Sequence, residues 1–145
     1  MLSNFGIIVS TVSLLLTGSI LYLSYYDLKL SGNNVSKKIY KCAFFQIIFT
    51  FLGFILLIIA YVISDFSLIN VYENSHTTKP MFYKISGTWG NHEGSLLLWI
   101  NILVLFSFLF LIFNRNKNKN FKLYTIIFQN LLILVFLIFL LTNSN

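Results

Sequence analysis

Residues 94–113 read GSLLLWINILVLFSFLFLIF, a run of twenty residues without a charged side chain. At a rise of about 1.5 Å per residue, a helix of this length crosses the roughly 30 Å hydrocarbon core of a bilayer. Similar apolar blocks occupy residues 5–26, 40–63 and 123–141. Lipid offers the backbone no hydrogen-bond partner, and the apolar residues run continuously instead of alternating, so the blocks predict helices and not barrel strands. The sequence therefore predicts an all-α membrane protein with four transmembrane helices.

The composition excludes an ordinary soluble domain. Of the 145 residues, 57% are hydrophobic and 10% are charged, and the mean hydropathy is +0.82. The net charge of +6 could indicate nucleic-acid binding, so the placement of the basic residues has to decide. Eight of the ten flank the first and third connections between the blocks: Lys29, Lys37, Lys38, Lys41, Arg115, Lys117, Lys119 and Lys122.

With four spans, those two connections lie on the same side of the membrane. The positive-inside rule places them in the cytoplasm or matrix, which explains the charge without nucleic acid. Residues 64–93 and both termini are then expected on the opposite side. We predict a single membrane domain over residues 1–145, with residues 64–93 as its long non-cytoplasmic loop between the second and third helices.

Polar residues inside the first two blocks suggest how the helices pack. Ser10, Ser13, Thr17 and Ser24 recur at spacings of three, four and seven, which puts their hydroxyls on one face of the first helix. Such a face is expected to pack against protein. In the second block, Gln46 lies close enough to the basic boundary to reach interfacial water, and no role is predicted for it.

The connection 64–93 is much longer than the other two, and a long loop in a compact unit usually serves a function. It holds three of the four acidic residues, both histidines and the one proline. After Pro80, an apolar stripe at Met81, Ile85 and Trp89 predicts a short helix that lies in the membrane interface and ends near Gly87 or Gly90.

Without a resemblance to a known family, the residues predict no metal site, disulfide or catalytic motif. His76 and His92 are sixteen positions apart and form no close-spaced ligand motif, so no metal site is predicted. Cys42 is the sole cysteine, which excludes an internal disulfide. The chain has no nucleophile elbow, phosphate loop or paired-carboxylate motif, so catalysis by this chain alone is not expected. Glu93 has a structural role available, since a carboxylate is stabilised at the start of a helix.

Four segments carry a resemblance: residues 61–71 (YVISDFSLINV), 74–76 (NSH), 79–80 (KP) and above all 83–99 (YKISGTWGNHEGSLLLW). Together they resemble the N-terminal region of the CcmF-type cytochrome c haem lyase. The resemblance implies a role in joining haem covalently to the Cys-x-x-Cys-His site of apocytochrome c. In that family, the haem is held by histidines and a tryptophan-rich segment on later helices, which have no counterpart here.

This chain therefore resembles one piece of a split lyase, as encoded in some mitochondria, with haem bound by the assembled complex and its ligands on partner chains. The implied partners are companion lyase fragments, apocytochrome c, a haem delivery protein and membrane lipid. The hydroxyl face of the first helix and the long loop are expected to bind the companion fragments. The implied location is the mitochondrial inner membrane with the loop in the intermembrane space; a bacterial inner membrane with a periplasmic loop is the alternative.

The resemblance also implies a surface near the haem and apocytochrome site. Its residues are Trp89, Gly90, Asn91, His92, Glu93, Gly94 and Ser95, with His76 and Asp65 as secondary candidates. The alternative function is a non-catalytic structural subunit of a respiratory membrane complex, which would not need such a polar loop. An ion or proton carrier is disfavoured, because no ionisable residue lies in the middle of a predicted span.

Overall fold

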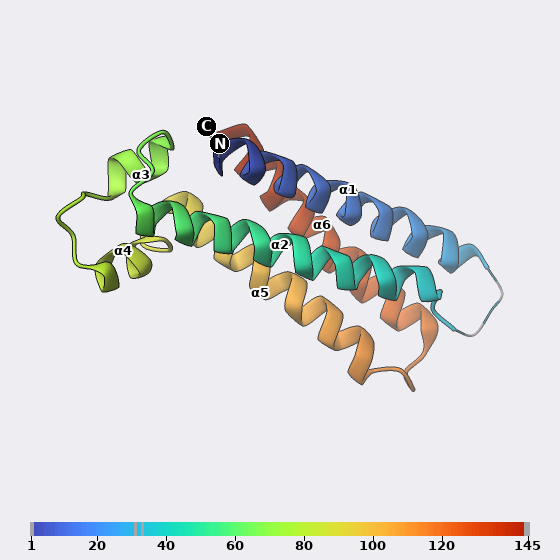
Figure 1. Cartoon of the computed structure of the whole chain (residues 1–145). Coiled ribbons are helices and arrows are strands. Elements are labelled where there is room, and N and C mark those ends of the chain that lie inside the picture. The colour runs from blue at the N-terminus through green and yellow to red at the C-terminus, as the bar shows by residue number, and fades with distance from the viewer. Residues whose placement is uncertain (1, 31, 33, 144–145) are drawn as a thin grey trace.

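A computed structural model describes residues 2–30, 32 and 34–143, and this part of the chain forms six helices (Figure 1). The long helices are α1 (Leu2–Lys29), α2 (Lys37–Ile63), α5 (His92–Phe113) and α6 (Lys119–Asn143). The short helices α3 (Ile69–Asn74) and α4 (Met81–Gly87) lie between α2 and α5. All four long helices are long and apolar enough to cross a membrane. This confirms the prediction of an all-α fold with four such helices, and each predicted block lies within one of them.

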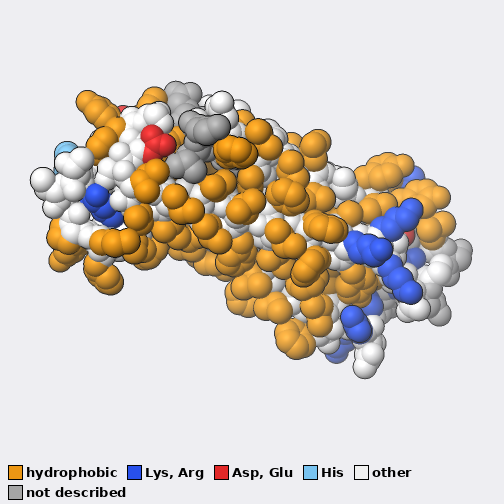
Figure 2. Space-filling model, in the orientation of Figure 1, with side chains coloured by type: hydrophobic (Ala, Val, Ile, Leu, Met, Phe, Trp, Pro, Cys, Tyr) orange, Lys and Arg blue, Asp and Glu red, His pale blue; other side chains and the backbone are white. Residues whose placement is uncertain are grey.

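The long helices pack side by side as a bundle, in which α1 contacts α2 and α6, and α5 contacts the same two helices. The start of α1 and the end of α6 lie at the end of the bundle that carries α3 and α4 (Figure 1). Most of the lysines that face the viewer gather at the opposite end, and hydrophobic side chains cover the surface between the two ends (Figure 2). The bundle therefore has a basic end and an end built by the connection between α2 and α5, called the loop end below.

Polar side chains meet in the interior of the bundle, where they connect all four long helices. The Gln46 amide on α2 donates to the Thr17 hydroxyl on α1 at 2.7 Å and to the Asn130 side-chain oxygen on α6 at 3.1 Å. Asn130 in turn donates to the Ser107 hydroxyl on α5 at 3.5 Å. The prediction that Gln46 reaches interfacial water was wrong: only 1% of it is exposed. Its position along the helix gave its depth but not the direction in which its side chain points.

The hydroxyl face of α1 turns inward, as predicted. Ser13, Thr17 and Ser24 are buried, and Ser10 is half-buried. The Thr17 hydroxyl also donates to the Ser13 carbonyl oxygen at 2.8 Å, so it is satisfied within the chain. The expectation that this face binds companion fragments was wrong, because α2 and α6 already cover it.

Candidate functional site

The loop end begins where α2 stops. Ser64 takes a left-handed conformation with φ 56° and ψ 50°, and the Asp65 N–H donates to the Ala60 carbonyl oxygen at 2.9 Å, which turns the chain out of the helix. Helix α4 then begins directly after Pro80 and ends at Gly87, as the apolar stripe predicted. Its Lys84 ammonium donates to the Ser64 hydroxyl at 2.6 Å, which fastens α4 to the end of α2.

Three side chains from distant parts of the sequence form a hydrogen-bonded cluster at this end. The Tyr61 hydroxyl donates to the side-chain oxygen of Asn70 at 2.6 Å and accepts from the Asn91 amide at 2.7 Å. The Asn70 amide donates to the Asn91 side-chain oxygen at 3.0 Å, which closes the triangle. We call these residues the Tyr61–Asn70–Asn91 cluster. It ties α2, α3 and the start of α5 together, and Tyr61 is fully buried within it.

Asn91 also builds the first turn of α5. Its side-chain oxygen accepts from the Gly94 N–H at 2.7 Å, which makes Asn91 the N-cap residue. Its amide nitrogen also lies 3.2 Å from each of the Gly87 and Thr88 carbonyl oxygens, both within donating geometry. Asn91 therefore fixes where α5 begins relative to the chain that leaves α4.

Gly94 is required because the chain that leaves α4 passes close over the first turn of α5. A Cβ atom placed on Gly94 would lie 1.7 Å from the Thr88 carbonyl oxygen. Backbone comes so close here that no side chain fits. Gly94, which the family resemblance places on a haem-proximal surface, is buried beneath the loop.

Glu93 lies in the first turn of α5, where its carboxylate faces the positive end of the helix dipole. It accepts a hydrogen bond from the Asn70 amide, so it is linked to the Tyr61–Asn70–Asn91 cluster. The structural role expected for Glu93 is therefore present in the fold.

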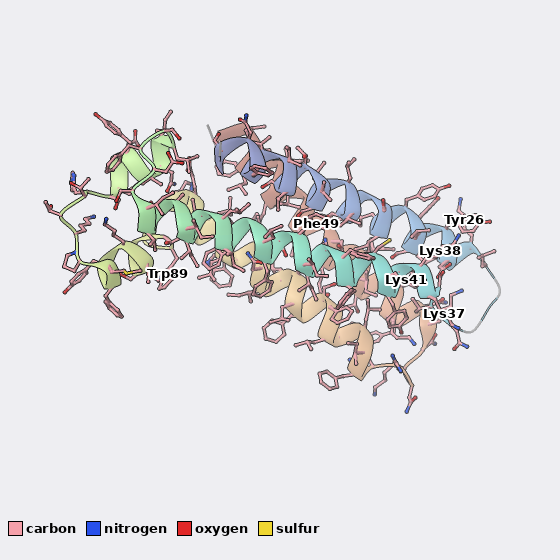
Figure 3. All side chains as sticks on the ribbon, viewed as in Figure 1. Tyr26, Lys37, Lys38, Lys41, Phe49 and Trp89 are labelled. Atoms are coloured by element: carbon pink, nitrogen blue, oxygen red, sulfur yellow. The ribbon has the colours of Figure 1, made fainter. Side chains whose placement is uncertain are left out.

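The remaining residues of the predicted surface point outward. Trp89 is 42% exposed and lies at the loop end, far from the basic end (Figure 3). Gly90 and His92 are exposed as well. The His92 ring lies edge-on to Phe139 of α6, with ring centroids 5.9 Å apart, and its carbonyl oxygen accepts from the Ser95 hydroxyl at 2.9 Å. The string 89–95 thus divides into a buried framework and an outward surface.

A groove of about 350 Å³ opens beside this surface, between α3 and the facing ends of α5 and α6. Its polar lining includes Asn70, Glu73, His92 and Glu93, and Phe139 and Leu140 form part of its apolar wall. Two carboxylates and one imidazole thus border a partly apolar hollow. Its chemistry suits a polypeptide segment with mixed polar and apolar side chains better than a small anion.

The two secondary candidates lie elsewhere. His76 is exposed on the turn between α3 and α4 and does not line the groove. Asp65 accepts from the Ser67 hydroxyl at 2.6 Å and from the Ser67 N–H at 3.2 Å, and these bonds hold the pKa of the carboxyl below its usual range. Asp65 therefore stabilises the turn after α2.

The side chains described do not fit a haem pocket by themselves. Within residues 2–30, 32 and 34–143, no three His, Cys, Asp or Glu side chains gather as a metal site would require. His92 lines the groove of about 350 Å³, whereas His76 does not.

Comparison with known proteins gives a consistent set of relatives. The chain is 45% identical over 100 residues to the cytochrome c-type biogenesis protein CycK of Bradyrhizobium diazoefficiens, a match covering 69% of this chain and 15% of the relative. It is 46% identical over 94 residues to the cytochrome c-type biogenesis protein ccl1 of Rhodobacter capsulatus, covering 65% and 14%. It is 35% identical over 93 residues to the cytochrome c-type biogenesis protein CcmF of Escherichia coli, a match covering 64% of this chain and 14% of the relative.

The matches thus span about 15% of the length of these curated relatives. No family model and no solved structure matches the chain.

Proposed function

We propose that this chain, which is homologous to the CcmF-type cytochrome c biogenesis proteins, is a membrane subunit of a cytochrome c maturation haem lyase. In this role it assists the covalent attachment of haem to the Cys-x-x-Cys-His site of apocytochrome c. The observation that carries the proposal is the 45% identity over 100 residues to a cytochrome c biogenesis protein. The match spans 15% of that relative, and we propose that haem ligands on companion chains complete the lyase.

The loop end would serve as the working surface of this subunit. The Tyr61–Asn70–Asn91 cluster and the Asn91 cap hold the start of α5 against α3 and α4. On this framework, Trp89 remains exposed, and His92 is exposed where it lines the groove of about 350 Å³. The subunit would use this surface to position apocytochrome c or a companion chain, while catalysis requires the assembled complex.

In the proposed orientation, residues 1–145 form one membrane domain. The basic end faces the matrix, and residues 64–93 face the intermembrane space of mitochondria. A bacterial inner membrane with the loop in the periplasm is the alternative, and the bacterial relatives agree with it. In both cases the loop end lies on the side where c-type cytochromes receive haem.

His92→Ala and Trp89→Ala test the working surface, since both side chains are exposed and neither supports the Tyr61–Asn70–Asn91 cluster. We expect each variant to lower holocytochrome c several-fold, measured by haem staining, while the subunit stays at its normal level in the membrane. Trp99→Ala is the matched control, because Trp99 is 59% exposed on the side of α5 and outside the groove. Normal holocytochrome c in both variants would contradict the proposed role of the surface.

Purification from the native membrane tests the assignment to a lyase. We expect a tryptophan-rich, histidine-bearing membrane protein to co-purify with the chain. Stable association with an oxidase or a dehydrogenase alone would instead support a structural subunit of a respiratory complex.

A further inference from the structure

A second groove, far from the loop end, has features that the proposed function does not use. It has a volume of about 760 Å³ and lies between α1 and α2 at the basic end of the bundle. Lys38 and Lys41 line it on α2, and Tyr22 lines it on α1. Figure 3 shows Lys37, Lys38 and Lys41 together at the start of α2, next to Tyr26 at the end of α1. We call this hollow the Lys38–Lys41 groove.

Away from the lysines, the wall of the Lys38–Lys41 groove becomes apolar. Leu15, Gly18 and Tyr22 follow one another at spacings of three and four along α1, and Lys38, Lys41 and Phe45 do so along α2. Gly18 presents no side chain, and a Cβ placed there would meet no atom within 4 Å. The groove is therefore positively charged at its mouth and apolar inside.

The ammonium groups at the mouth have no internal partner. Lys119 and Lys122, at the same end, donate to the Leu30 and Arg115 carbonyl oxygens at 3.0 and 2.9 Å. The ammonium groups of Lys38 and Lys41 have no hydrogen bond or ion pair with any residue that the structure describes, and only the backbone N–H of Lys38 donates to a side chain, the Ser36 hydroxyl. The acidic side chain nearest in sequence, Asp27, is buried and accepts from the Ser36 N–H at 2.7 Å. The two lysines are thus available to an anion.

The depth of the groove distinguishes a lipid from a partner helix. From Tyr22 to Leu14, α1 advances eight residues, or about 12 Å. That is close to the roughly 15 Å hydrocarbon depth of one leaflet. A partner helix would need a groove along the whole bundle, whereas an acyl chain of one leaflet ends near the midplane.

We propose that the Lys38–Lys41 groove binds an anionic glycerophospholipid from the leaflet at the basic end. The headgroup phosphate lies between the two ammonium groups at the start of α2. One acyl chain lies along Leu15, Gly18 and Phe45. This inference does not depend on the proposed function, since it concerns the opposite end of the molecule.

Native mass spectrometry of the full chain in detergent tests the proposal. Phosphatidylglycerol and phosphatidylcholine with identical acyl chains serve as probes. We expect phosphatidylglycerol to be retained preferentially, and Lys38→Gln/Lys41→Gln to weaken its binding by about 30-fold. Arg115→Gln/Lys117→Gln is the matched control, because it removes the same charge from the same end, outside the groove. It should bind the lipid as the unaltered chain does.

A second pair of variants tests the apolar part of the groove without changing charge. Gly18→Leu places a side chain in the groove, and Gly6→Leu places the same side chain elsewhere on α1, where a Cβ also meets no atom within 4 Å. We expect only Gly18→Leu to reduce lipid retention. Equal retention of the two lipids, or equal effects within either pair of variants, would overturn the proposal. So would crosslinking of Cys42, which lines the groove, to a partner polypeptide in native membranes.

Discussion

At the residue scale, the seven residues 89–95 include some that support the start of α5 and others that face outward. Asn91, Glu93 and Gly94 build the start of α5, whereas Trp89 and His92 face outward. Because the outward side chains contribute little to the fold, they can be changed without unfolding the loop. Asn91, Glu93 and Gly94 cannot, since hydrogen bonds and close backbone contact depend on them.

Gly94→Ala is expected to be strongly destabilising, because its Cβ would overlap the Thr88 carbonyl oxygen and force α5 away from the loop. Overpacking of this kind costs about 1–3 kcal/mol. Thermal unfolding in detergent, followed by circular dichroism, measures the loss. Gly90→Ala is the matched control: its Cβ would come no closer than 3.5 Å to other atoms, an ordinary contact, so its unfolding temperature should stay unchanged. Equal stability of the two variants would contradict this packing.

At the element scale, α3 is held in place by few contacts. It packs through Val71 against Tyr61 and is otherwise tied to α2 and α5 by the Tyr61–Asn70–Asn91 cluster. A helix of six residues has almost no stability of its own, so these contacts decide whether it forms. This also explains why the sequence did not predict α3: its residues carry no strong helical pattern.

Tyr61→Phe removes the hydroxyl that donates to Asn70 and accepts from Asn91, while the ring stays in place. We expect a loss of about 1–3 kcal/mol, because the half-buried side chains of Asn70 and Asn91 each lose one hydrogen bond. Hydrogen exchange of the α3 amides should accelerate, and mass spectrometry measures it. Tyr72→Phe is the control, since Tyr72 is 68% exposed and its hydroxyl bonds to none of the residues described. Unchanged exchange in Tyr61→Phe would show that other contacts hold α3.

The four long helices are joined by the interior amides. Gln46→Leu removes two hydrogen bonds and leaves Thr17 and Asn130 without that partner. Buried interhelical hydrogen bonds in membrane proteins contribute about 0.6 kcal/mol on average and up to about 1.7. We therefore expect a loss of about 1–2 kcal/mol in unfolding by sodium dodecyl sulfate in mixed micelles.

Gln129→Leu is the matched control for Gln46→Leu. The side-chain oxygen of Gln129 is buried without a hydrogen-bond partner among the residues described, so its removal should cost nothing or stabilise slightly. If both variants unfolded alike, the polar interior would not join the helices as described.

At the scale of the whole molecule, charge separates the two ends. The basic end carries the connections before α2 and before α6, and the loop end carries α3 and α4 (Figures 1 and 2). Lys and Arg residues in short loops, within about 15–20 residues of a span, determine which side stays inside. The arrangement of the bundle thus links the proposed working surface to the side opposite the lysines.

Thiol labelling tests this orientation in a Cys42→Ser background. We expect Thr77→Cys, exposed between α3 and α4, to react with a membrane-impermeant maleimide in intact mitoplasts or spheroplasts. Lys117→Cys, exposed between α5 and α6, should react only after permeabilisation. The opposite pattern would place the loop end inside and would exclude the proposed contact with apocytochrome c.

The sequence by itself determined the four long helices, the short helix after Pro80 and the collection of basic residues in two connections. These features depend on length, hydropathy and local turn chemistry, which are properties of neighbouring residues along the chain. Only the tertiary structure decided that Gln46 points into the bundle, that the hydroxyl face of α1 is already covered, and that Asn91 and Gly94 support the surface on which His92 lies. The direction of a side chain depends on what packs beside it: the hydrogen-bond partners of Gln46 lie 29 and 84 positions away, and Thr88 covers Gly94 only because the chain folds back between them.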